Sequence, residues 1–237
     1  LYDPQANFAY PQFPDDDRLP TSVANSRAKA VYGNMRLSLA DPLTLVLGGR
    51  VTWLDMHRSQ HQPEAGSPSE KSSQSESQKF TPFYGLIYDL NDTYSLYANY
   101  AEVFNPQPVS NLDINNNIIA PIEGTQHEVG IKGEFLDGAV NASLAAFQIE
   151  EENRAIPDMN DPSSRAVEAG GKARTRGVEM EMSGEVMKDL QLMAGYTFAE
   201  SHDADDQRVA TNQPQHLFKL ATNYRLPEEW RKVTVGG

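Results

Sequence analysis

The stretch Val178-Glu179-Met180-Glu181-Met182-Ser183 puts a Val and two Met at alternate positions, with two Glu and a Ser between them. Successive side chains of a β-strand point to opposite faces, so this stretch predicts a strand with one apolar and one polar face. The same period of two recurs in residues 43–53, 94–100, 128–135 and 218–225. The sequence therefore predicts strands that each lie between two different surroundings.

The spacing of these segments predicts hairpins with a short turn at one end and a long loop at the other. About ten strands are expected, with ends defined to within a few residues, near 27–40, 43–57, 78–90, 93–104, 123–135, 138–152, 172–185, 189–200, 215–226 and from 231 onward. Short turns rich in Asp, Asn, Pro or Gly fall at 41–42, 91–92, 137–138, 188–189 and 227–228. Long polar loops are expected at 58–77, 105–122, 153–171 and 201–214, with residues 1–26 as the tail of another.

This asymmetry indicates a transmembrane β-barrel of the outer-membrane type. Mean hydropathy is only −0.57, and no run approaches the roughly 18 to 20 apolar residues of a membrane-spanning helix. Barrel strands show lipid only at every second residue, and outer-membrane barrels combine short periplasmic turns with long extracellular loops. Aromatic residues near strand ends are expected in the interfacial girdles: Trp53, Tyr88, Tyr94, Tyr196, Phe198 and Tyr224. A soluble β-sandwich, which also has a polar exterior, remains an alternative.

Composition and motifs exclude several function classes. The net charge is −13, which argues against nucleic acid as a partner because that needs a basic footprint. Cys is absent, and no Gly-rich phosphate loop or Gly-x-Ser-x-Gly elbow occurs. We therefore expect no enzyme activity, no catalytic residues and no cofactor.

Three groups of polar residues are interpreted as structural rather than as metal or catalytic sites. His57 and His61 have helical spacing but lie at a strand end, so we expect no metal site there. The acidic residues 203–206 lack the ligand spacing of a calcium loop and are interpreted as a solvated loop. Glu179 and Glu181 are interpreted as neighbouring wall residues on the polar face of a strand.

Four segments, in this order, resemble the barrel of TonB-dependent ferric-siderophore receptors. They are a tyrosine-rich strand running into a phenylalanine-proline loop (94–107), a hairpin start with Glu123, Gly124, Glu128, Gly130 and Lys132, the segment Ala145–Ile149, and Arg176-Gly177-Val178-Glu179 within residues 174–181. Pro121-Ile122-Glu123-Gly124 departs from the family's pattern by one inserted residue. The resemblance covers most of residues 27–237.

The resemblance implies that residues 1–237 are a fragment of the β-barrel domain, with about ten strands of a barrel of about 22. We expect the N-terminal plug, the segment that engages TonB and the closing C-terminal strands to be absent. No signal peptide is visible at Leu1-Tyr2-Asp3-Pro4, so we expect it to be removed or to lie outside this chain. The parent protein is expected in the outer membrane of a Gram-negative bacterium, as a monomer among lipid and lipopolysaccharide.

By resemblance, the parent protein binds a ferric siderophore at its outer surface and imports it with energy supplied through the TonB complex. The siderophore keeps its own iron wrapped, so the receptor is expected to use aromatic and hydrogen-bonding contacts and no metal ligands. Candidate ligand-binding residues lie at extracellular strand ends and in long loops: Tyr10, Phe13, Phe104, Asn105 and Arg154. The alternatives are a passive porin-like or adhesin barrel, and a soluble β-sandwich that binds carbohydrate.

Overall fold

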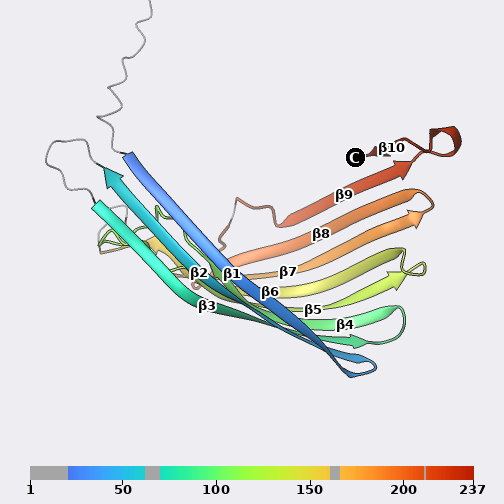
Figure 1. Ribbon diagram of the computed structural model, residues 1–237, viewed down its shortest axis with the longest axis horizontal. Coiled ribbons are helices and arrows are strands. Elements are labelled where there is room, and N and C mark those ends of the chain that lie inside the picture. The colour runs from blue at the N-terminus through green and yellow to red at the C-terminus, as the bar shows by residue number, and fades with distance from the viewer. Residues whose placement is uncertain (1–20, 62–69, 161–165, 211) are drawn as a thin grey trace, which may run out of the picture.

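The computed structural model describes residues 21–61, 70–160, 166–210 and 212–237, which form one antiparallel sheet of ten strands in sequence order (Figure 1). The strands are β1 (Thr21–Ala40), β2 (Leu43–His61), β3 (Glu70–Asp89), β4 (Tyr94–Asn105), β5 (Ile122–Phe135), β6 (Val140–Pro157), β7 (Val167–Met187), β8 (Leu190–Asp203), β9 (His216–Arg225) and β10 (Thr234–Gly236). One 3-10 helix, η2 (Glu228–Trp230), precedes β10. The fold class expected from the period-two pattern is confirmed: all β, antiparallel and part of a barrel wall.

The short connections gather at one end of the sheet, on the right in Figure 1, and the long loops at the other. The turn between β7 and β8 is only Lys188 and Asp189, and Asp189 has φ 65°, a conformation that Asp tolerates better than most residues. The turn after β3 is closed by Asn91, whose Oδ1 accepts hydrogen bonds from the backbone N–H groups of Thr93 and Tyr94, both at 2.9 Å. These turns lie where the Asp, Asn and Gly residues predicted them.

Cross-strand register separates two faces, here named the apolar face and the polar face. One row of paired residues on the apolar face runs Leu37, Leu45, Leu86, Ala98, Val129, Ala146, Val178 and Phe198 from β1 to β8. A row on the polar face runs Asp89, Ser95, Lys132, Ser143, Glu181, Gly195 and Lys219 from β3 to β9. The sheet is therefore two-sided along its whole width, as a barrel wall between lipid and an aqueous lumen requires.

The apolar face is exposed and is not packed against a second layer. Leu144 is 45% exposed, Met180 49% and Val129 58%, although each lies near the middle of the sheet. A β-sandwich buries such faces between two sheets, whereas all ten strands of the described residues belong to one sheet. This excludes the sandwich alternative. Among the described residues no helix is long and apolar enough to cross a membrane.

The strands extend further toward the loop end than the sequence predicted. β3 begins at Glu70 rather than near 78, so part of the Ser- and Gln-rich segment expected as a loop is strand, and β6 continues to Pro157 rather than 152. β7 begins at Val167 rather than near 172, and β1 begins at Thr21 rather than near 27. These extensions pair through the backbone, and their sequences lack the apolar–polar alternation that marks the middle of each strand. The expected strand from 231 onward is only the short β10.

Candidate functional site

The connection between β4 and β5, residues 106–121, folds back against β2 at the loop end of the sheet. Leu54 and Met56 of β2 are 3% and 1% exposed and pack with Ile118 of this connection, which is 4% exposed. Phe104, Val109 and Leu112 pack against the same cluster. Leu112 and Ile118 also form a β-bridge, so the connection has a defined structure rather than a loose one.

The structure places the predicted ligand-binding residues in different surroundings. Phe104 packs against the apolar cluster at Leu54 and Met56, and the exposed Asn105 ends β4 opposite Ile122. Tyr10 and Phe13 lie outside the described residues. Ligand contact by these residues stays a prediction.

Arg154 lies on the polar face because of a β-bulge in β6. Glu151 pairs with Ala173 and Arg154 pairs with Gly171, so two residues of β6, Glu152 and Asn153, lie opposite one residue of β7. The extra residue reverses the alternation, which puts Arg154 on the same face as Glu151 instead of the face of Glu152. Nη1 of Arg154 donates to Oε2 of Glu151 at 2.5 Å, and the Arg154 side chain is 37% exposed. The bulge therefore turns the guanidinium toward the lumen side.

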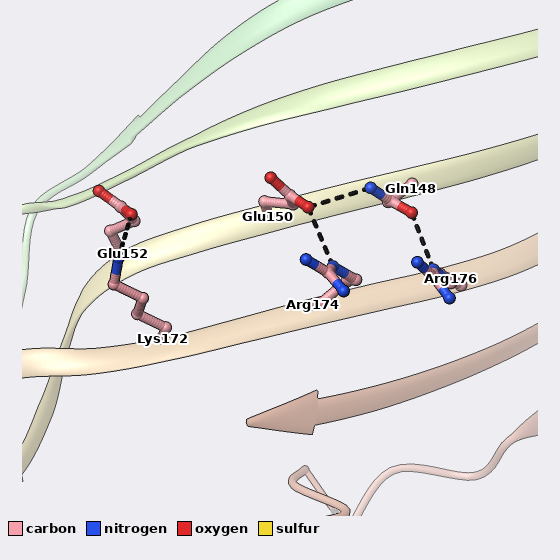
Figure 2. Close-up of polar contacts among 6 residues, drawn as sticks. All are labelled: Gln148, Glu150, Glu152, Lys172, Arg174 and Arg176. Atoms are coloured by element: carbon pink, nitrogen blue, oxygen red, sulfur yellow. Dashed lines mark hydrogen bonds and ion pairs between the residues drawn. The ribbon is translucent and has the colours of Figure 1, made fainter. Parts of the chain in front are cut away.

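Six charged or amide side chains on neighbouring strands form a second feature of the loop end, which we name the β6–β7 ladder (Figure 2). Its three rungs are Glu152 Oε1 to Lys172 Nζ (2.7 Å), Glu150 Oε1 to Arg174 Nε (2.9 Å) and Gln148 Oε1 to Arg176 Nε (2.8 Å). Each strand contributes three alternate residues, so all six side chains lie on one face. The next cross-strand pair on that face is Ala146 with Val178, so the ladder directly continues the apolar face.

Aromatic rings and histidines lie where the apolar face gives way to the ladder. Tyr100 stacks on Tyr84 with 5.8 Å between ring centroids and lies 5.1 Å from the ring of His127. In the next strands, the hydroxyl of Tyr196 and Nδ1 of His216 are hydrogen-bonded at 2.8 Å. Aromatic side chains with one polar end are typical of the boundary between hydrocarbon and water. The ladder therefore lies just above this boundary, on the outer surface of the wall.

The charged side chains of the ladder are largely exposed to water. The exposed fractions are 62% for Lys172, 61% for Glu152, 55% for Arg174 and 43% for Glu150, so water and salt screen these pairs and they add little to stability. The hydrogen bond and negative charge of Glu152 raise the pKa of Lys172. The ladder carries both signs of charge, with Glu150 and Glu152 against Lys172, Arg174 and Arg176.

The groups that were interpreted as structural have ordinary structural contacts. Oδ1 of Asp203 accepts hydrogen bonds from the backbone N–H groups of Asp205 and Gln207, as in a solvated turn. Glu179 accepts a hydrogen bond from Thr197 Oγ1 at 3.2 Å across the polar face. His57 lies in β2 and contacts Asp55 at 3.0 Å. In the part of the chain that the structure describes, no three His, Asp or Glu side chains are arranged to hold a metal ion.

Comparison with known proteins agrees with this architecture. Residues 2–237 match the family described as "TonB dependent receptor-like, beta-barrel". The chain belongs to this family. The resemblance found in the Tyr-rich and Arg-Gly-x-Glu segments is thereby confirmed, and the family is one of transport receptors rather than enzymes.

Pyoverdine receptors are among the similar proteins. The chain is 40% identical over 209 residues to the ferric-pyoverdine BN7/BN8 receptor of Pseudomonas putida, covering 88% of this chain and 25% of that protein. It is 40% identical over 218 residues to the ferripyoverdine receptor of Pseudomonas aeruginosa, covering 90% of this chain and 25% of that protein. A crystal structure of the P. aeruginosa receptor bound to ferripyoverdine has a TM-score of 0.73 at 38% identity, covering 90% of this chain and 28% of that one. The chain thus spans about a quarter of the length of these relatives.

Sequence reasoning missed the β6–β7 ladder. Its signal is present in the sequence, because residues 148–152 carry Gln and Glu at alternate positions and residues 172–176 carry Lys and Arg at alternate positions. Only the register of β6 against β7 brings the two series opposite each other. Burial of Leu54 and Met56 was also missed, because the loop that covers them comes from a distant part of the chain.

Proposed function

We propose that this chain is a segment of the barrel wall of an outer-membrane receptor that binds a ferric siderophore and imports it in a TonB-dependent manner. The observation that carries the proposal is the 40% identity to two ferric-pyoverdine receptors over about nine tenths of the chain. We further propose that the chelate is of the pyoverdine class. The siderophore is a ligand with its own iron, so the wall needs hydrogen-bonding and charged groups at its rim, such as Arg154, and no metal-ligating cluster.

Growth and binding assays test this proposal. A strain that lacks the complete gene should lose growth on at least one ferric pyoverdine as its iron supply, and the purified receptor should bind that chelate. Growth should return with the intact gene and fail without TonB. A deletion strain that still grows on every ferric pyoverdine tested would refute the proposal.

We propose that the complete receptor carries a plug upstream and further strands that close the barrel. The plug would provide the segment that engages TonB. A passive porin-like barrel would lack such a plug. β1 and the short β10 lie at the two edges of the sheet, and in this proposal further strands of the receptor pair with them. We expect a monomer, which the mass of the receptor in detergent would test.

Lipopolysaccharide is the lipid partner that we propose for the outer surface, in the outer membrane of a Gram-negative cell. The β6–β7 ladder lies just above the aromatic boundary, at the level of lipid headgroups, and Arg174 and Arg176 donate to their partners in the ladder through Nε. Guanidinium groups bind phosphate with paired hydrogen bonds. Replacing both arginines by Glu should lower the lipopolysaccharide that co-purifies with the receptor several-fold, whereas Lys219→Glu on the polar face should not. Equal amounts in all three proteins would contradict this assignment.

A further inference from the structure

Gln107 is a buried polar residue whose side chain contacts two other residues of its own connection and one residue of β6. It follows β4 by two residues and is 4% exposed. Its Nε2 donates hydrogen bonds to the backbone carbonyls of Ala120 at 2.8 Å and of Asn153 at 2.5 Å. Its Oε1 accepts a hydrogen bond from Asn111 Nδ2 at 3.3 Å. One side chain therefore joins both ends of the 106–121 connection to β6.

Asn153 also donates a side-chain hydrogen bond to the 106–121 connection. Its Nδ2 donates to the carbonyl of Pro121 at 3.2 Å, and its backbone has φ 62°. Asn adopts this left-handed conformation more readily than most residues, and here it lies within the bulge at Glu152 and Asn153. The bulge thus aims a backbone carbonyl at Gln107 and a side-chain amide at Pro121.

A backbone hydrogen bond also joins the 106–121 connection to β7. The N–H of Val167, the first residue of β7, donates to the carbonyl of Leu112 at 2.9 Å. The connection between β4 and β5 is therefore fastened at Gln107, at Pro121 and at Leu112. Because Ile118 also packs on Met56, the connection and the upper ends of β2, β6 and β7 form one body.

We propose that Gln107 is a positioning residue for ligand binding, which holds the β6 bulge in place and so keeps Arg154 on the lumen side. This inference rests on the proposed function, in which Arg154 contacts the ferric chelate. Without the bulge, the alternation of β6 would carry Arg154 to the opposite face, beside Glu152. Gln107 acts at a distance from the ligand, through the bulge.

The cost of losing this bond follows from its burial. A partly buried carbonyl that loses its donor bears a desolvation penalty, and a bulge is an irregular backbone that depends on its surroundings. Gln107→Met keeps the size of the side chain and removes its amide. We expect it to weaken chelate binding about tenfold, as expected for the loss of a buried hydrogen bond.

The experiment compares variants of the complete receptor with a panel of ferric pyoverdines. The variants are Gln107→Met, Arg154→Ala, the double variant, and Asn115→Ala as a control at the exposed tip of the same connection. Dissociation constants are measured for the chelate that the wild type binds. Backbone amide exchange is followed over residues 106–121 and at Asn153.

If Gln107 acts through Arg154, the double variant binds about as weakly as the weaker single variant, and amide exchange in 106–121 speeds up in Gln107→Met but not in Asn115→Ala. Additive losses of affinity would overturn the proposal, because Gln107 would then act by another route. Unchanged exchange or unchanged affinity in Gln107→Met would also overturn it. A wild type that binds none of the chelates instead refutes the proposed function, which separates the two failures.

Discussion

Replacing Gly177 by Ala should destabilise the wall, because two neighbouring strands leave no room for a methyl group. A Cβ at this position would lie 2.3 Å from the carbonyl oxygen of Phe198 and 2.5 Å from Cζ of Phe147. The Phe147 ring can move a little, but the carbonyl belongs to the backbone of β8. Overpacking of this kind costs about 1 to 3 kcal/mol, and we expect about 3 kcal/mol because one of the overlaps is with backbone.

Gly195→Ala is the matched control on the same face of the sheet. A Cβ there would meet no atom closer than Met180 O at 3.9 Å, so the substitution should be neutral or slightly stabilising, by about 0.4 to 1 kcal/mol, through the unfolded chain. The double change Gly177→Ala with Phe147→Leu should recover only part of the loss, because the clash with Phe198 O remains.

The assay is urea unfolding of the complete receptor in lipid vesicles. The denaturant slope is about 1 to 3 kcal/mol per molar urea for small proteins and rises with size, so for the complete receptor a loss of about 3 kcal/mol lowers the midpoint by up to about 1 M. Equal midpoints for Gly177→Ala and Gly195→Ala would refute the reasoning, since the two substitutions add the same methyl group and differ only in the space around it.

Three further outcomes are expected at the loop end. Met56→Ala should loosen the 106–121 connection by about 2 to 5 kcal/mol, as for other buried side chains cut to Ala, and amide exchange there should speed up; unaltered exchange would speak against the packing. Asp113→Ala removes the Oδ1 that accepts the N–H groups of residues 115 and 117 at 2.8 and 2.7 Å, so those two amides should exchange faster, while slow exchange would show that the turn does not need it. Glu152 raises the pKa of Lys172, so less of the amine is neutral at any given pH, and amine-reactive labelling at pH 9 should be faster in Glu152→Gln; equal rates by mass spectrometry would contradict the contact.

The middle of each strand could be predicted from the sequence, and its loop end could not. Between lipid and lumen the two faces of a strand need different side chains, so residues 178–183 alternate clearly. At the loop end, Glu70–Glu76 of β3 pairs with β2 although its sequence carries no apolar–polar alternation. The expected boundary near residue 78 therefore marks the end of the apolar band rather than the end of the strand.

The Arg176-Gly177-Val178-Glu179 segment shows how much of the wall a short motif contains. Arg176 belongs to the β6–β7 ladder, Gly177 lets Phe147 and the β8 backbone approach closely, and Glu179 bonds to Thr197 on the polar face. The sequence alone indicated the two faces but not these neighbours, because each comes from another strand.

The sequence of β6 gives no indication of the bulge that turns Arg154 toward the lumen side. It depends on a one-residue mismatch between β6 and β7 and on the contacts of Asn153 with a connection about 30 residues earlier. Alternation counted along β6 alone assigns Arg154 to the wrong face. The candidate site is therefore the part of the wall that is least accessible to pattern reasoning.

The order of the strands has a consequence for how this wall can change over evolution. Every strand lies beside its neighbours in the chain, so each hairpin is a contiguous piece of sequence with its own turn. Excising the two strands and the connection between Tyr94 and Phe135 would bring β3 next to β6 with direction still alternating. Such a barrel would have two fewer strands and a smaller circumference, and its wall would remain continuous. The circumference can therefore change by gain or loss of whole hairpins.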